Sequence, residues 1–448
     1  MVTHVGRWTG VGAELRKRMR SEAVRKIAKN SGWLMGERVL TMALALTLHV
    51  WLARYLGPTR FGVLSYAISL VGLFGTFTYL GLSGLVLRDL VEQPEARDEI
   101  LGTVFGLKLI GGLIGVVLIG TVAFAQPMNG TTRWVLVLAS AGLLFHAFRV
   151  VEFWFASRVE SRYAVLASSA AAITAAVANA SLILAGAGVV GFAVVLFLQP
   201  AALAAGLLFV YIKRGGVLSS WRYVGGRARS LLSQSWPLLL ASAGALVYLK
   251  VDQVMLGVMV GHEHVGVYAV AARLSEVWYF IPAALALSVF PKIIESRKEG
   301  DAIYERRLQR TYNALAVMAV AVAILVTIAS GPVIELLYDD RYREASRILA
   351  IHIWAAPAMF MGALLSKWLI AEDLLTFSFT RHLIGAVANV GLNLFLIPKY
   401  GGTGAAVATL VAYTLASYGA CFTDPRTRVA GRMMTRAMLT PLLILRRS

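Results

Sequence analysis

The chain has 448 residues, of which 58% are hydrophobic and 15% are charged, and its mean hydropathy is +0.70. Soluble proteins carry roughly a quarter charged residues. This composition therefore excludes an ordinary soluble domain and indicates a polytopic membrane protein. The net charge of +19 is concentrated at span ends and in the tails, a pattern typical of membrane orientation and contact with anionic membrane lipids, and not of nucleic-acid binding.

Apolar windows predict twelve transmembrane helices, and therefore an all-α membrane protein. Lys and Arg are abundant in both tails and in the loops on the same side as the tails. The positive-inside rule then predicts that both termini are cytoplasmic, and an even number of spans agrees with that orientation. The predicted spans lie near 33–55, 61–85, 100–125, 134–156, 163–187, 189–212, 230–256, 264–290, 313–337, 348–370, 374–397 and 401–423.

The basic segments divide the chain into five predicted parts. These are a cytoplasmic N-terminal segment (1–32), a first six-helix lobe (33–212), a cytoplasmic linker (213–229), a second six-helix lobe (230–424) and a cytoplasmic tail (425–448). The N-terminal segment spaces apolar residues four apart among cations, which suits either a helix lying on the membrane surface or a disordered tail. The linker contains two Gly pairs and is the predicted hinge.

The two lobes repeat each other weakly. The stretch GPTRFGVLSYA, which begins at Gly57, matches GHEHVGVYAVA, which begins at Gly261, and AVANASLIL from Ala176 matches AVANVGLNL from Ala386. Because each lobe has an even number of spans, both enter the membrane in the same orientation and are related by an axis along the membrane normal. This predicts two pseudo-symmetric lobes around a central cavity, the architecture of a carrier.

Ionisable residues inside the spans are the candidate functional residues, because each is costly unless it is paired or hydrated. Two pairs lie three residues apart on one helical face and can neutralise themselves in part. They are Arg149 with Glu152 and Arg273 with Glu276.

Other charges within spans have no such neighbour. Lys250 and Asp252 are two residues apart, so their side chains diverge around the helix and each needs a partner on another span or a hydrated cavity. Lys108 and Arg381 have no opposite charge within four residues in their own spans. Each of these groups either lines a cavity or forms a buried structural pair. For Asp252, a structural partner and a functional role are equally expected.

Cations outnumber anions inside the spans, which suits an anionic substrate such as a phosphate or pyrophosphate. The predicted substrate-binding cations are Lys250, Arg273, Arg381, Lys108 and Arg149. The carboxylates Asp252, Glu276 and Glu152 are expected to hold these cations or to bind a coupling ion, either H⁺ or Na⁺.

Several kinds of site are not predicted. The lone Cys421 excludes a disulfide framework and a cysteine metal cluster. His262 and His264 do not have the four-residue spacing of a helical zinc motif, so no metal site is expected. The sequence lacks the phosphate-binding Gly-Lys-Ser/Thr loop of ATPases, and no cofactor or catalytic residue is predicted.

Two long stretches resemble a known family. The segments ARYLGPTRFGVLSYAISLVGLFGTFTYLGLSGLVLRDL (from Ala53) and DQVMLGVMVGHEHVGVYAVAARLSEVWYFIPAALALSVFPKI (from Asp252) resemble bacterial lipid-linked oligosaccharide flippases, also called polysaccharide or O-antigen exporters. That family belongs to a superfamily that also contains multidrug/cation antiporters and lipid II flippases.

The resemblance implies a multi-pass carrier of the bacterial inner membrane that moves an undecaprenyl-pyrophosphate-linked oligosaccharide to the outer leaflet by alternating access. The product would feed the assembly of a cell-surface polysaccharide such as O-antigen or exopolysaccharide. Glycosyltransferases and polymerases are the implied assembly partners. Lys250, Arg273 and Arg381 would then contact the headgroup.

Two other functions remain as alternatives. A multidrug/cation antiporter of the same superfamily would favour an acidic cavity, against which the surplus of cations argues. A membrane polymerase or ligase acting on lipid-linked sugars would need a large loop with catalytic residues, whereas the longest loops on the outer side have about ten residues or fewer. The sequence therefore predicts a transporter and not an enzyme.

Overall fold

The structure, a computed structural model, describes the backbone of residues 6–445 and the side chains of residues 25, 29–374 and 376–440. Within this part of the chain every regular element is a helix, and ten helical segments are long and apolar enough to cross a membrane. Large apolar side chains point away from the protein on these segments: Leu184, Ile328 and Phe395 are 81%, 75% and 73% exposed. Such a surface faces lipid, so the prediction of an all-helical membrane protein is confirmed.

Two of these segments are hairpins. Helix α1 (Gly6–Tyr79) is interrupted at Gly57, whose φ of 70° and ψ of 170° are open to glycine, and Pro58 starts the returning helix. The rings of His49 and Phe61 lie 4.9 Å apart, whereas a straight helix would separate them by about 18 Å. Helix α14 (Leu375–Ser417) is broken in the same way at Gly401, with φ 53° and ψ −132°.

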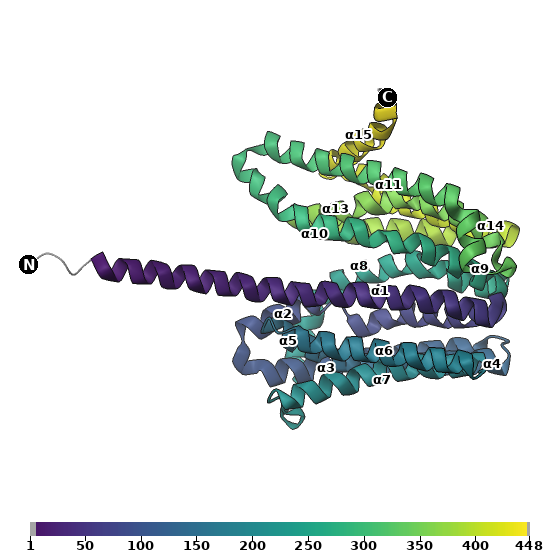
Figure 1. Ribbon diagram of the computed structural model, residues 1–448, viewed down its shortest axis with the longest axis horizontal. Coiled ribbons are helices and arrows are strands. Elements are labelled where there is room, and N and C mark those ends of the chain that lie inside the picture. The colour runs from purple at the N-terminus through teal and green to yellow at the C-terminus, as the bar shows by residue number, and fades with distance from the viewer. Residues whose placement is uncertain (1–5, 446–448) are drawn as a thin grey trace, which may run out of the picture.

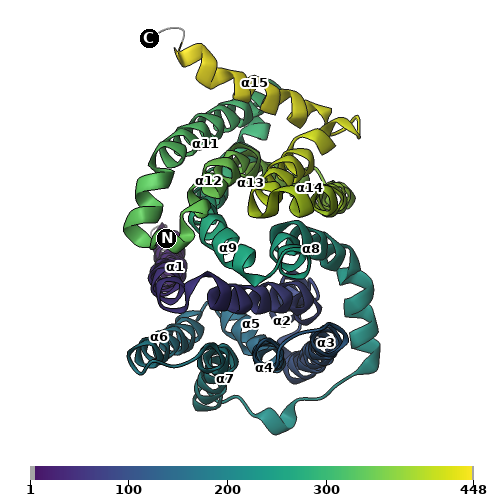
Figure 2. The same ribbon diagram turned by 90° about the vertical axis from the view of Figure 1, so that its right-hand side faces the viewer.

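The helices form two groups, and α1, which belongs to the first group, lies at the boundary between them (Figures 1 and 2). The beginning of α1 extends beyond the other helices as a continuous helix (Figure 1), and by Asn30 it already contacts Ser161 at the start of α6. The first group contains α1, α2 (Ser83–Glu92), α3 (Arg97–Ala125), α4 (Gly130–Ala141), α5 (Val150–Ser157), α6 (Arg162–Leu184) and α7 (Val189–Lys213). The second contains α8 (Gly225–Met259), α9 (His262–Glu276), α10 (Phe280–Glu295), α11 (Asp301–Leu337), α12 (Glu344–His352), α13 (Ala356–Ala371), α14 and α15 (Arg428–Leu445).

Three of the membrane-length segments change from α to 3₁₀ geometry and back. The 3₁₀ turns are Gly142–Arg149 between α4 and α5, Val277–Tyr279 between α9 and α10, and Ile353–Ala355 between α12 and α13. Short 3₁₀ stretches within a helix often mark functional positions. Two of them directly adjoin predicted site residues, since Arg149 ends the first turn and Glu276 precedes the second.

The two groups meet at the end of the bundle that carries Gly57, Gly261 and Gly401, which we call the glycine end. A Cβ atom on Gly62 would lie 1.7 Å from the carbonyl oxygen of His262, and one on Gly266 would lie 2.1 Å from that of Pro58. The contact is reciprocal, because the sequence match that begins at Gly57 and Gly261 pairs Gly62 with Gly266 and Pro58 with His262. The weak repeat in the sequence thus corresponds to a symmetric backbone crossing between α1 and α9.

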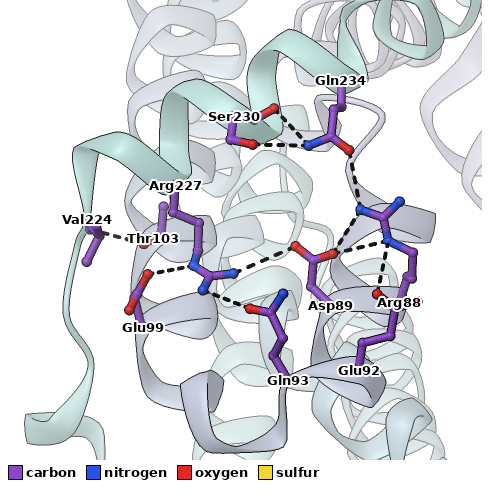
Figure 3. Close-up of polar contacts among 10 residues, drawn as sticks. All are labelled: Arg88, Asp89, Glu92, Gln93, Glu99, Thr103, Val224, Arg227, Ser230 and Gln234. Carbon is purple, nitrogen blue, oxygen red and sulfur yellow. Dashed lines mark hydrogen bonds and ion pairs between the residues drawn. The ribbon is translucent and has the colours of Figure 1, made fainter.

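Helix α8 packs on both groups. Near its start it is docked on α2 and α3 at the opposite end of the bundle, which we call the linker end (Figure 3). Arg227 Nε lies 2.6 Å from Glu99 Oε1, and Arg227 Nη1 lies 3.8 Å from Asp89 Oδ2. Arg88 Nη2 donates to Gln234 Oε1 at 3.3 Å. The first turns of α8 are therefore held by the first group.

The remainder of α8 packs within the second group. Tyr248 stacks edge-on against Tyr413 of α14, with ring centres 5.1 Å apart, and its hydroxyl lies 3.0 Å from His382 Nδ1. Pro237 lies between the two parts of the helix and lacks the N–H that would bond one turn back. One continuous helix therefore connects the linker end of the first group with the interior of the second.

Candidate functional site

A cavity of about 310 Å³ lies between the two groups. Both arms of the α1 hairpin and α7 line it from the first group, and α8 and α9 line it from the second. Most of its wall is apolar, with a small set of polar side chains, as is common for ligand sites. These are His49, Ser65, Ser69, Lys250, Gln253, Arg273 and Glu276.

Three of the predicted site residues meet in this cavity. Lys250 Nζ lies 3.5 Å from Glu276 Oε2, so the partner of Lys250 is on α9 and not on its own helix. The expected pairing of Glu276 with Arg273 is not formed, because Glu276 points to Lys250 instead. Arg273 has no ion pair with any acid whose side chain the structure describes. The cavity thus contains two cations and one carboxylate.

Hydrogen bonds fix the polar wall around these charges. Ser69 Oγ donates to Gln253 Oε1 at 2.7 Å, a bond that joins α1 to α8 across the group boundary. His49 Nδ1 lies 3.2 Å from the hydroxyl of Tyr338. Gln253 also lines the cavity, and the bond from Ser69 uses its amide oxygen and not its N–H donors.

Asp252 lies on the opposite side of α8, where it is 2% exposed. Its carboxylate accepts hydrogen bonds from Tyr268 Oη at 2.8 Å, Asn393 Nδ2 at 2.7 Å and Thr409 Oγ1 at 2.5 Å. Lys250 and Asp252 therefore have separate surroundings, as their spacing predicts. All of the groups that bond to Asp252 are neutral, so it does not hold any of the predicted cations.

The Asp252 cluster also contains unused polar atoms. Asn393 Oδ1 and Asn389 Nδ2 are buried without a hydrogen-bond partner among the residues that the structure describes. Asn393 Nδ2 also donates to Asn389 Oδ1 at 3.0 Å. The cluster offers oxygen atoms of the kind that bind hard cations, from a carboxylate, a phenol, a hydroxyl and two amides. The cluster can hold a cation or a proton at Asp252.

The remaining predicted residues of the first group lie outside the cavity wall. Arg149 and Glu152 form the expected pair, with Nε to Oε1 at 3.0 Å and a second bond at 3.2 Å. Lys108 is 3% exposed, and its Nζ lies 5.7 Å from the ring centre of Tyr79 and 5.4 Å from that of Phe153. Aromatic faces thus stabilise this ammonium group.

Arg381 also lies outside the cavity wall. It is 3% exposed, its Nη2 donates to Ser366 Oγ at 2.8 Å, and its Nε is buried with no partner in the described part of the chain. Sequence reasoning grouped it with Lys250 and Arg273 because all three are cations within spans. Burial among the helices of the second group separates it from the other two.

The cavity is bounded toward the glycine end by contacts between the groups. Tyr342 Oη donates to the carbonyl oxygen of Ala53 at 2.8 Å, and Arg341 Nη2 donates to that of Arg54, also at 2.8 Å. These carbonyls belong to the last turn of α1 before the break, where helical partners are missing. Asp339 hydrogen-bonds to Arg341, which holds the pKa of that carboxyl below its usual range.

Sequence reasoning missed Ser69, Gln253 and the neutral partners of Asp252, because uncharged polar residues are common in helices. One signal was present. Asn389 and Asn393 are four residues apart in a repeated apolar stretch, so both amides lie on one helical face. Two amides on the same face of a membrane helix indicate a polar partner on another helix.

Two family models match the chain. The model described as polysaccharide biosynthesis protein matches residues 27–297, and the model described as lipid II flippase MurJ matches residues 267–445.

Similar proteins and structures are known. The chain is 23% identical over 400 residues to the "Probable flippase AglR" of Haloferax volcanii, a match that covers 88% of this chain and 82% of that protein. It is 22% identical over 406 residues to the "Putative O-antigen transporter" of Shigella flexneri, covering 85% and 94%. Two solved structures share the fold at 15% identity. They are the lipid II flippase MurJ in an inward closed conformation (TM-score 0.69, covering 94% and 92%) and an inward-facing MATE family transporter (TM-score 0.66, covering 88% and 96%).

Proposed function

We propose that this chain, which belongs to the polysaccharide biosynthesis protein family, is a flippase for a polyprenyl-pyrophosphate-linked oligosaccharide. Its relatives include a protein described as a probable flippase and one described as a putative O-antigen transporter, and the chain is a transporter-type protein and not an enzyme. The main support for the proposal is the cavity between the two groups, where Lys250 lies together with Arg273, which forms no ion pair with any described acid.

Unpaired guanidinium groups are costly at membrane depth unless a ligand or water satisfies them. A diphosphate offers oxygen atoms in the fork geometry that guanidinium matches, and Lys250 adds a second positive charge. The cavity volume of about 310 Å³ is at the lower end of ligand sites. It accommodates a phosphate-sized headgroup, whereas the attached sugars require the two groups to move apart.

The architecture suits alternating access. If the hairpins at Gly57 and Gly401 each count as two crossings, the ten candidate segments contain twelve, and the proposed lobes are 33–212 and 230–424, joined by 213–229. Contacts between the groups close the glycine end. We infer that the linker end, with both basic tails, is cytoplasmic and that the membrane is the bacterial inner membrane. Anionic lipids would contact these tails, and glycosyltransferases or polymerases are proposed assembly partners.

The Asp252 cluster is the proposed coupling-ion site. An ionised carboxylate buried without a positive charge is strongly destabilised, and a proton or Na⁺ would neutralise it. The neutral donors around Asp252 and the unused oxygen of Asn393 support a site that exchanges its charge. Glu276 lies on the cavity side and is not part of this cluster, and Glu152 is paired with Arg149.

Transport by the purified protein in liposomes tests the proposal. A fluorescent polyprenyl-pyrophosphate oligosaccharide is placed in one leaflet, and its exposure to an impermeant quencher is followed with and without a pH or Na⁺ gradient. We expect protein-dependent flipping that Arg273→Gln and Lys250→Gln each reduce. Arg306→Gln is the matched control, because Arg306 is an exposed arginine on α11 outside the cavity.

Two further results separate the alternatives. The Asp252→Asn variant should lose the dependence on the ion gradient while it still binds the lipid, because it removes the charge of the proposed ion site. No flipping, together with exchange of organic cations in the same vesicles, would refute the proposal in favour of a cation antiporter.

A further inference from the structure

The cavity contains a carboxylate whose charge opposes the proposed substrate. Glu276 is the last residue of α9 and lies beside Lys250 on α8. Side chains of both residues are partly open to the cavity, with exposed fractions of 29% for Lys250 and 20% for Glu276. A carboxylate in an anion-binding cavity weakens that cavity for its ligand, so its presence calls for a functional reason.

We propose that Glu276 is an internal counter-anion that pairs with Lys250 while the cavity is empty and releases it to the phosphate group of the substrate. This inference rests on the proposed function and deepens it, because it assigns to one residue of the site the role of substrate release. The substrate class is a polyprenyl diphosphate, recognised through its negative charge.

The geometry favours exchange of one anion for another. The Lys250–Glu276 separation of 3.5 Å is longer than the 2.7–2.9 Å of a strong charge-assisted bond. Partly exposed pairs of this kind contribute little stability. A diphosphate presents several oxygens and also reaches Arg273, which Glu276 leaves unpaired. The ligand therefore gains a contact that Glu276 does not make.

The pairing of Glu276 with Lys250 would affect how fast the carrier releases its substrate. A carrier must bind its substrate strongly enough to load and weakly enough to release it on the other side. When the diphosphate leaves, Glu276 recombines with Lys250, which lowers the free energy of the empty site and so favours release. Without this carboxylate the two cations would hold the diphosphate more tightly, and release would slow.

Binding and transport measured on the same variants test this inference. The probe is a fluorescent short-chain polyprenyl pyrophosphate added to the full-length protein in nanodiscs, with the corresponding polyprenyl alcohol as the uncharged comparison. For Glu276→Gln we expect about fivefold tighter binding of the pyrophosphate, unchanged binding of the alcohol, and slower flipping in liposomes. Glu263→Gln is the matched control, because Glu263 is exposed on the same helix and outside the cavity wall.

A purely structural role for Glu276 predicts weaker pyrophosphate binding in place of tighter binding, since a damaged site would bind poorly, although flipping would be slower in both cases. Glu276→Asp serves as a milder variant that retracts the charge from Lys250 and should give a smaller gain in affinity. In the Lys250→Met background the gain from Glu276→Gln should shrink, because the two residues act on each other.

The possible failures are distinguishable. Unchanged or weaker pyrophosphate binding by Glu276→Gln, or tighter binding with unchanged flipping, would overturn the counter-anion role while leaving the proposed function intact. Unchanged binding by both Lys250→Gln and Arg273→Gln would instead overturn the phosphate site itself, and the counter-anion role with it.

Discussion

The reciprocal glycine crossing between α1 and α9 gives a quantitative prediction for the Gly62→Ala variant. The new Cβ would lie 1.7 Å from the carbonyl oxygen of His262, whereas close-packed atoms of this kind stay about 3 Å apart or more. The two backbones must therefore separate by more than about 1 Å. Overpacking of this degree costs about 1–3 kcal/mol, which lowers the closed-to-open equilibrium constant at the glycine end by about fivefold to more than a hundredfold.

A distance measurement between the two groups would detect this shift. Cys421 is the only cysteine, so Cys421→Ala gives a background into which spin labels can be placed at Arg60 and Glu263. Both positions are exposed, and they belong to opposite groups near the glycine end. The parent should give a short, narrow distance distribution by pulsed electron resonance. Gly62→Ala should add a longer component and lower the melting temperature.

The crossing is reciprocal, so Gly266→Ala must act in the same direction, with its Cβ 2.1 Å from the carbonyl oxygen of Pro58. Gly120→Ala on α3 is the control, because a Cβ at that position meets nothing within 4 Å. If both crossing variants keep the distance distribution and melting temperature of the control, the groups are not in backbone contact at the glycine end and the reasoning is wrong.

Three more outcomes are expected. Arg227→Gln removes the charge that holds the start of α8. The rate of amide hydrogen exchange in residues 221–236 should therefore rise by about tenfold or more. Unchanged protection would show that apolar packing alone holds this segment. Tyr268→Phe deletes one of the hydrogen-bond donors to Asp252 and should lower the unfolding free energy by about 1.5–3 kcal/mol. Thermal or denaturant melts measure this change, and an unchanged unfolding free energy would mean that the bond contributes nothing. Arg341 lowers the pKa of Asp339, so the stability that their contact contributes is present at neutral pH and is lost as the pH falls through that lowered pKa. Arg341→Ala should remove this acid-dependent part of the melting temperature, and an identical pH profile in the parent would contradict it.

Composition and periodicity were sufficient to predict the helical membrane fold, because a chain in lipid must satisfy its backbone within helices. The separate surroundings of Lys250 and Asp252 were also predictable, since residues two apart on a helix point in different directions. The repeat of Gly57 and Gly261 indicated equivalent positions in the two halves. Both glycines have a positive φ and stand where a helix begins after a break. The sequence repeat alone does not specify this backbone conformation.

The partners of the charged residues could not be derived from the sequence. Spacing suggested that Arg273 and Glu276 neutralise each other, but the choice of partner depends on how α8 packs against α9, and that packing placed Lys250 closer to the carboxylate. The same limit applies to Arg381, whose burial depends on the neighbouring helices of the second group. Local spacing ranks possible pairs, whereas tertiary packing decides between them.

Helix α8 carries both of the proposed binding sites and also contacts the first group. Its first turns are docked on the first group through Arg227, its middle contains Pro237, and its later turns carry Lys250 toward the cavity and Asp252 toward the buried cluster. The proposed coupling ion at Asp252 and the proposed anion at Lys250 would therefore act on opposite faces of the same helical segment. Because Pro237 lacks a helical hydrogen bond, bending there costs least. If the proposed function holds, binding of the coupling ion, binding of the substrate and relative movement of the two groups would be linked through α8, whichever of them occurs first.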